Sequence, residues 1–158
     1  MRHTISVLVR NEFGVLSRVA GMFSGRGYNI DSLNVAPTLD GKVSNMTIVT
    51  EGDDDTIEQI TKQLHKLIDV IKVTDHVSGS FVDREMAVLK IAPPTEARAE
   101  VLRVAEIFRG KIVDVSPKSF VIEVTGGPEK IQALVRLLEP LGLRELVRTG
   151  PLAMARGL

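Results

Sequence analysis

The chain has 158 residues, of which 44% are hydrophobic and 25% charged, enough apolar material for packed cores. Twenty Lys and Arg residues balance twenty Asp and Glu residues, so the formal net charge is zero and no general field attracts nucleic acid or anionic lipid. Cysteine is absent, which excludes disulfides and thiolate sites and is typical of a reducing compartment, so we expect a cytoplasmic protein.

The first half of the chain has the pattern of strand, helix, two strands, helix and strand. Residues 3–10 alternate apolar and polar side chains, as in a half-buried strand. No apolar run approaches the roughly 20 residues that a membrane span needs. The expected strands are at 3–10, 30–36, 43–50 and 70–77. A helix is expected from Val15 until Gly25-Arg26-Gly27 stops it, and another after Asp53, with an apolar stripe of Ile57, Ile60, Leu64, Leu67 and Ile68.

The second half repeats this order. Pro93-Pro94-Thr95 ends a strand and caps a helix, and Gly126-Gly127-Pro128 precedes another. The helices have apolar faces of Ala97, Val101, Ala105 and Phe108, and of Ile131, Leu134, Val135 and Leu138, and strands are expected at 85–92, 111–115, 119–125 and 143–148. Two βαββαβ series predict an α+β protein of two ferredoxin-like units, each with two helices on one face of a four-stranded antiparallel sheet.

The only small, polar and flexible stretch between the two series is Ser78-Gly79-Ser80, where we place the domain boundary. The first domain is therefore expected at residues 1–77 and the second at 81–150. Residues 151–158 are expected to form a loosely held tail.

No residue pattern points to catalysis or to a metal. His3, His65 and His76 lie at strand ends or on a polar helix side, without a partner at metal-ligand or base spacing. Asp53-Asp54-Asp55 fits a helix start, which favours negative charge, better than a magnesium site. We expect no catalytic residue and no metal site in this chain.

Two glycine-rich segments and the fold class raise the question of nucleotide binding. Residues 21–27 close a helix, whereas a dinucleotide loop opens one, and Gly126-Gly127 is not followed by Lys-Ser or Lys-Thr. Ferredoxin-like RNA-binding modules stack bases on strand aromatics, but aromatic residues make up only 4% of this chain. We expect neither phosphate-loop nor nucleic-acid binding.

The loop from Asn11 to Leu16 joins the first strand to the first helix. The first N–H groups of a helix lack internal acceptors and the helix dipole favours negative charge, so a ligand carboxylate can bind there without a basic side chain. Gly14 permits close backbone approach, and Asn11 can both donate and accept hydrogen bonds, which suits an amino-acid zwitterion. Asn and Gly are also ordinary turn residues, so the loop by itself leaves a simple turn and a binding site equally open.

A series of short motifs along nearly the whole chain resembles the acetolactate synthase (acetohydroxyacid synthase) small-subunit family, whose first domain is an ACT domain. The motifs occur in the order Asn11–Leu16, Arg26-Gly27-Tyr28-Asn29-Ile30, Leu33-Asn34-Val35-Ala36-Pro37-Thr38, Gln63-Leu64-His65-Lys66-Leu67, Arg84-Glu85, Phe108-Arg109-Gly110 and Arg148-Thr149-Gly150. Each is short, but together, with a second ferredoxin-like unit, they are specific to this family.

The resemblance implies a regulatory subunit that does no chemistry alone. Such subunits bind a catalytic subunit, a transferase that uses thiamine diphosphate, magnesium and FAD to condense pyruvate with pyruvate or 2-oxobutyrate. They raise its activity and confer feedback inhibition by branched-chain amino acids, typically valine. The resemblance also implies a homodimer through the ACT domains. Its expected effector-binding residues are Asn11, Phe13, Gly14, Val15 and Leu16 of one chain, with Asn29 and Ile30 of the other.

Two other functions stay open. A free-standing ACT-type amino-acid sensor or transcriptional regulator would share the loop, but the sequence has no helix-turn-helix pattern or basic stripe. A small enzyme on a ferredoxin-like fold is disfavoured because no base, nucleophile or metal set can be assembled.

Overall fold

The computed structural model describes all 158 residues, which form two compact units. The N-terminal unit comprises Met1–Val82 together with Leu152–Leu158, and the C-terminal unit comprises Asp83–Pro151. The α+β class with two ferredoxin-like units, predicted from the sequence, is confirmed. None of the helices is long and apolar enough to span a membrane.

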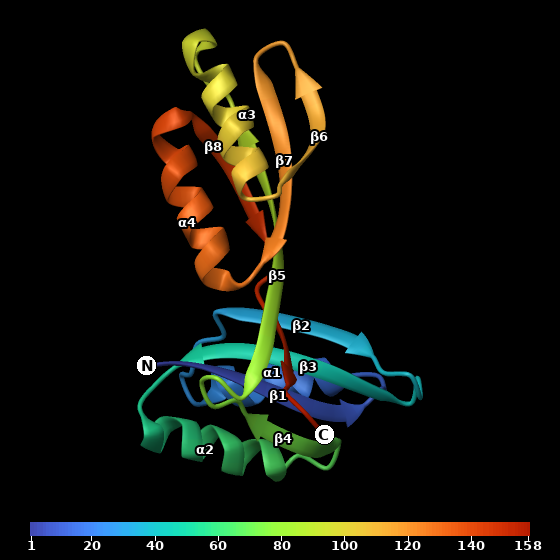
Figure 1. Cartoon of the computed structure of the whole chain (residues 1–158). Helices are drawn as coiled ribbons and strands as arrows, with labels where there is room; N and C mark the ends of the chain where they lie inside the picture. Colours follow the sequence, from blue (N-terminus) through green and yellow to red (C-terminus); the bar gives the residue numbers. More distant parts are fainter. The chain divides into compact units, whose positions relative to one another are not determined.

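The N-terminal unit is a four-stranded antiparallel sheet with two helices on one face (Figure 1). Its sheet has the order β2-β3-β1-β4. In chain order its elements are β1 (Arg2–Arg10), α1 (Val15–Gly25), β2 (Ser32–Pro37), β3 (Val43–Glu51), α2 (Asp54–His65) and β4 (Val70–Asp75). The strand β2 lies at one edge of the sheet.

The core of the N-terminal unit follows directly from the alternation in β1. Ile5, Val7 and Val9 are buried and pack against both helices, whereas the intervening side chains lie on the other face. The helices contribute the following buried residues: Val15, Val19, Met22 and Phe23 from α1, and Ile57, Ile60 and Leu64 from α2. This packing fixes both ends of α1 relative to the sheet.

The helix α2 begins with a side-chain cap. Oδ1 of Asp53 accepts a hydrogen bond from the N–H of Thr56 at 2.8 Å. Hydrogen bonds from the side chain and backbone of Thr56 lower the pKa of Asp53 below its usual 3.8. The acidic run at this position therefore begins a helix, as its sequence indicates.

The C-terminal unit repeats the architecture, with sheet order β6-β7-β5-β8 and two helices on one face (Figure 1). Its core contains Leu89 and Ile91 of β5, Val101 of α3, Ile122 of β7 and Leu134 of α4. The elements are β5 (Phe81–Ile91), a 3-10 turn (Thr95–Ala97), α3 (Arg98–Ile107), β6 (Lys111–Ser116), β7 (Ser119–Gly126), α4 (Pro128–Leu138), a second 3-10 turn (Glu139–Leu141) and β8 (Leu143–Arg148).

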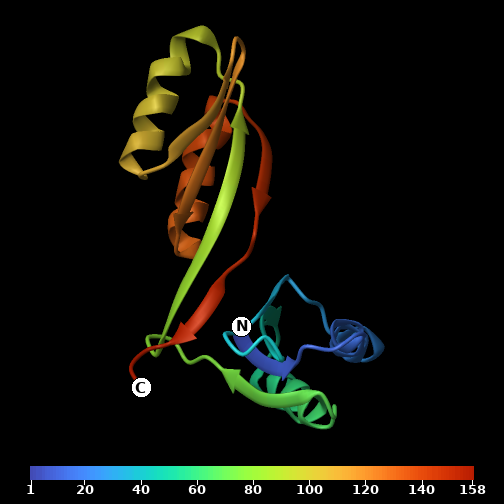
Figure 2. The ribbon, with the colours of Figure 1, turned by 90° about the vertical axis from the view of Figure 1, so that its right-hand side faces the viewer.

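The structure differs from the sequence expectations in the tail, at the ends of two helices and, by a few residues, in several strand bounds. The tail is not loose: Leu152–Ala155 forms a further strand, β9, which pairs with β5 (Figure 2). The helix α2 ends at His65, so Ile68 lies outside the expected apolar stripe and is 80% exposed. Ala97 belongs to the 3-10 turn before α3, because the two prolines hold the chain extended up to residue 94.

Candidate functional site

The loop between β1 and α1 is tied to the β2–β3 hairpin by Asn11. The N–H of Asn11 donates to the carbonyl oxygen of Lys42 at 2.8 Å, and its side-chain Nδ2 donates to the carbonyl oxygen of Gly41 at 2.9 Å. One side-chain hydrogen of Asn11 is therefore used to hold the loop. The acceptor Oδ1 stays available at an exposed position, so Asn11 both fixes the loop and can bind a ligand.

Gly14 has a backbone conformation that only glycine adopts readily. Its φ is 83° and its ψ is −5°, in the left-handed region. A Cβ at this position would lie 2.9 Å from Nη1 of Arg18. The turn into α1 therefore depends on glycine both for its conformation and for the space above it.

The N-terminus of α1 has open hydrogen-bond donors. It has no side-chain cap and no acidic residue in its first turn, unlike α2. The N–H of Val15 makes only a long 3.4 Å bond to the carbonyl oxygen of Glu12, and those of Leu16 and Ser17 have no acceptor in the chain. Unpaired donors together with the helix dipole have the chemistry to accept a carboxylate or another small anion.

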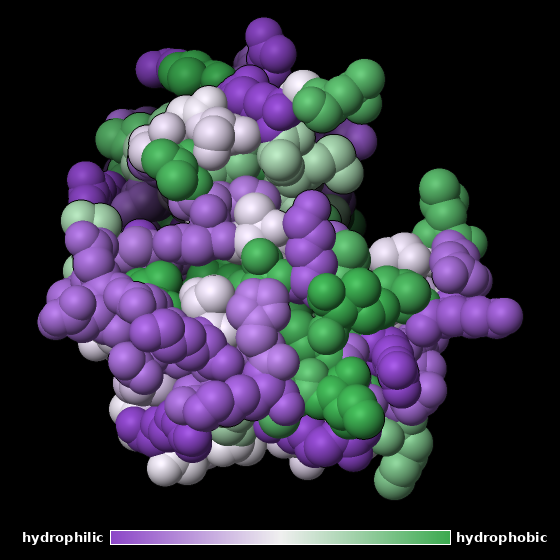
Figure 3. Space-filling model, turned by 90° about the horizontal axis from the view of Figure 1, so that it is seen from below, coloured by the Kyte–Doolittle hydropathy of each residue, from purple (hydrophilic) through white to green (hydrophobic).

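The side chains of the loop divide between core and surface. Val15 is buried in the core and can offer a ligand only its backbone. Phe13 is fully exposed and Leu16 is 46% exposed, so both provide apolar surface beside the open donors. Apolar side chains also reach the surface elsewhere, as in the view from below in Figure 3, where an apolar area is bordered by hydrophilic side chains.

Asn29 and Ile30 lie beyond the other end of α1. This helix has 11 residues, so about 16 Å separates its two ends. Nδ2 of Asn29 donates to Oδ1 of Asp31 at 2.7 Å, its carbonyl oxygen accepts from Oγ1 of Thr50 at 2.6 Å, and Ile30 packs partly against the core. The chain therefore does not bring Asn29 and Ile30 together with the loop from Asn11 to Leu16.

Comparisons with known proteins identify the family. Residues 5–72 match the family described as "AHAS small subunit-like ACT domain", and residues 84–157 match "Small subunit of acetolactate synthase". The acetolactate synthase small subunit of Aquifex aeolicus is 52% identical over 156 residues, which cover 98% of this chain and 81% of that protein. The chain belongs to the acetolactate synthase small-subunit family.

Other members of this family agree in sequence and in structure. The probable acetolactate synthase small subunit of Archaeoglobus fulgidus is 51% identical over 157 residues, covering 99% of this chain and 98% of that protein. The crystal structure of the acetolactate synthase small subunit from Thermotoga maritima has a TM-score of 0.89 at 42% identity, covering 100% of this chain and 99% of that one. Both ferredoxin-like units are thus features of the acetolactate synthase small-subunit family.

Two of the three histidines of this family member, His3 and His76, have side-chain partners. His65 is exposed, and Nδ1 of His3 lies 3.2 Å from Oδ1 of Asp75. Nε2 of His76 lies 2.6 Å from Oγ of Ser6, and its ring packs against Phe81 at 4.9 Å. Burial lowers the pKa of His76 below its usual 6.5, against a smaller opposing effect of Asp75.

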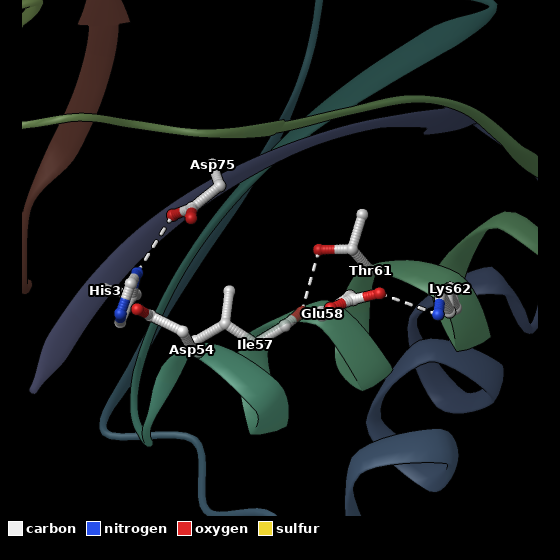
Figure 4. Close-up of a pocket in the computed structure, with 7 residues that line it drawn as sticks. All are labelled: His3, Asp54, Ile57, Glu58, Thr61, Lys62 and Asp75. Atoms are coloured by element: carbon white, nitrogen blue, oxygen red, sulfur yellow. Dashed lines mark hydrogen bonds and ion pairs between the residues drawn. The ribbon is translucent and has the colours of Figure 1, made fainter.

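A pocket of about 440 Å³ lies beside α2, with His3 and Asp75 on the sheet and Asp54, Glu58 and Lys62 on the helix (Figure 4). Nε2 of His3 has no partner there. Glu58 forms an ion pair with Lys62 at 2.7 Å, and Asp75 is within hydrogen-bond distance of His3. No group of three or more His, Asp or Glu side chains is placed to hold a metal ion.

Two residues that shape the loop, Arg18 and Asp69, were not predicted from the sequence. Nε of Arg18 donates to Oδ2 of the buried Asp69 at 2.8 Å, and Nη2 lies 3.5 Å from the carbonyl oxygen of Phe13. Arg18 is four residues after Gly14, a helical spacing that could have drawn attention to it. Nothing in the sequence around Asp69 indicates this contact.

Proposed function

We propose that the chain is the non-catalytic regulatory subunit of an acetolactate synthase, which activates a separate catalytic subunit and makes it sensitive to feedback inhibition by valine. The observation that carries this proposal is the set of open donors at the start of α1, next to Gly14, in a member of the small-subunit family. The holoenzyme would act in the cytoplasm, in branched-chain amino-acid biosynthesis. Thiamine diphosphate, magnesium and FAD would belong to the catalytic subunit.

The loop suits each part of a small amino acid. The open N–H groups of Leu16 and Ser17 can receive its carboxylate. The exposed side chains of Phe13 and Leu16 can cover an alkyl group such as that of valine. The ammonium group needs oxygen acceptors, and Oδ1 of Asn11 supplies only one of them.

The missing acceptors are proposed to come from Asn29 and Ile30 of a second copy. Within one chain the length of α1 keeps these residues away from the loop, so a complete site requires a homodimer. Support comes from the exposed Asn29 and from the edge strand β2 that follows it, since an edge strand can pair with another chain. Two such copies would form two identical sites about a twofold axis.

Inhibition requires that valine bind one arrangement of the assembly better than another. A coupling free energy of about 1 to 3 kcal/mol is usual for such effects and corresponds to roughly 5- to 150-fold in affinity. Binding with equal affinity to both arrangements would leave the catalytic subunit unaffected.

A mixing experiment tests the shared site. Asn11→Ala and Asn29→Ala should each abolish valine inhibition alone. When the two variants are unfolded together and refolded as a mixture, half of the dimers combine them, and each mixed dimer has one intact site. About a quarter of the sites should then bind valine in calorimetry, as expected for an isologous dimer.

The controls are each variant refolded alone and the wild-type protein refolded in the same way. If the mixture binds no more valine than its two parents, the site is not shared between chains. The rival function, a free-standing amino-acid sensor, predicts valine binding without any effect on a catalytic subunit.

A further inference from the structure

The guanidinium of Arg18 lies directly over the loop that begins α1. Its Nε is bound to Oδ2 of Asp69 at 2.8 Å, and its Nη2 points to the carbonyl oxygen of Phe13 at 3.5 Å. Its Nη1 has no acceptor in the chain and lies 2.9 Å from the point that a Cβ of residue 14 would occupy. One charged donor thus lies above Gly14 without a partner in the chain, on a side chain that is 49% exposed.

Asp69 holds this guanidinium in place. Its side chain is only 6% exposed, and a buried carboxylate needs a charged or hydrogen-bonding partner. Asp69 also fixes the adjoining backbone, because its carbonyl oxygen accepts from the N–H of Arg10 at 2.9 Å. Asp69, which directly precedes β4, is therefore bonded to the end of β1 through its backbone and to the first turn of α1 through its side chain.

Three contributions that favour an anion gather at this one place without an acceptor in the chain. The first is Nη1 of Arg18, and the second is the N–H groups of Leu16 and Ser17. The third contribution is the partial positive charge that these amides carry at the start of α1, which adds attraction for an anion but no further donor. A helical side chain covers the turn that precedes its own Cα, so the guanidinium of residue 18 lies over the same turn as these amides. Such a set is matched by a carboxylate, whose two oxygens can accept from a guanidinium and from backbone amides together.

We propose that Arg18 is an effector-binding residue, which donates Nη1 to the carboxylate of the amino acid while Asp69 holds the guanidinium in position. This inference rests on the proposed function of the loop and extends it. Arg18 makes the site charge-assisted, so it selects ligands with a free carboxylate. A side chain at position 14, where a Cβ would lie 2.9 Å from Nη1, would also displace this donor.

The substitution that tests this is Arg18→Lys. A lysine ammonium is a compact charge and lacks the planar fork of a guanidinium. When it pairs with Asp69, it therefore places no second donor group above Gly14. We expect L-valine to bind the purified dimer about 10- to 100-fold more weakly in calorimetry, the effect of losing one charge-assisted hydrogen bond. The matched control is Arg103→Gln, at an exposed arginine of α3 in the other unit.

Arg18→Gln alone would leave Asp69 buried without a partner, so the neutral form is tested as the double variant Arg18→Gln/Asp69→Asn. It should fold, by circular dichroism, and bind valine as weakly as Arg18→Lys. If it does not fold, Arg18→Lys, which retains a cation for Asp69, decides the question.

A spectroscopic measurement separates direct binding from a purely structural role. The protein is labelled with ¹⁵N-arginine, and the Nη signals of Arg18 are identified because they are missing in Arg18→Lys. These signals should shift when the protein is saturated with valine. The Nη signals of Arg103 should not shift. Unchanged Nη signals, or wild-type affinity in Arg18→Lys, would overturn the inference while the proposed function stands. If the wild-type protein binds no valine at all, the proposed effector site fails and this inference fails with it.

Discussion

Gly14→Asp should remove most of the valine inhibition of the reconstituted holoenzyme and leave its activation by this subunit intact. An aspartate at φ 83° is strained, and its carboxylate would lie beside Nη1 of Arg18, where the ligand's carboxylate is proposed to bind. It would also compete with Asp69 for the guanidinium. The valine concentration for half-maximal inhibition should rise at least about 10-fold, within the range of usual allosteric coupling.

The control for this substitution is Gly21→Asp. Gly21 lies in the same helix, a Cβ there would meet nothing within 4 Å, and its φ is outside the left-handed region. This variant should keep normal valine inhibition. Asn11→Ala should also relieve inhibition, because it removes both an acceptor and the bond to Gly41. Full valine sensitivity in both Gly14→Asp and Asn11→Ala would show that the effector does not bind this loop.

The largest effect on stability is expected from Glu85→Ala in the C-terminal unit. Glu85 has a side chain only 1% exposed, and its Oε1 accepts from Nε of Arg148 at 2.6 Å. Arg148 also donates from Nη1 to Oε1 of Gln132 at 3.0 Å, which joins β5, β8 and α4. Removing Glu85 leaves the charge of Arg148, whose side chain is 25% exposed, with only Gln132 as a partner. Breaking a buried pair in this way costs up to about 3 to 5 kcal/mol.

Urea unfolding followed by circular dichroism measures this cost as a lower transition midpoint for the C-terminal unit. The matched control is Lys90→Ala, which breaks an exposed pair between the same two strands, Lys90 with Glu145 at 3.2 Å. Exposed pairs contribute at most about 1 kcal/mol, so its midpoint should hardly move. Equal effects of the two substitutions would mean that burial of the Glu85–Arg148 pair has no energetic role.

Much of the fold could be predicted because local periodicity and tertiary packing agree. The alternation from Ile5 to Val9 and the stripe from Ile57 to Leu64 are both buried as predicted. The error at Ile68 arose because two apolar residues after the end of α2 continued the helical spacing. The strand β9 gave no such signal, since Leu152 and Met154 are exposed and the strand depends on pairing with β5.

The candidate site could be predicted only where it is local. Gly14 and the start of α1 are recognisable from a strand, a glycine turn and a helical stripe in succession. The Arg18–Asp69 pair joins positions 51 residues apart, and no periodicity encodes such a contact. The proposed contribution of Asn29 comes from another chain, so a single sequence can suggest it only by resemblance to a family.

The most direct test mixes the purified protein with an acetolactate synthase catalytic subunit and measures acetolactate formation with and without valine. The proposed function predicts higher activity on adding this chain, and loss of most of that activity on adding valine, while the catalytic subunit alone stays insensitive. No stimulation and no response to valine would contradict it.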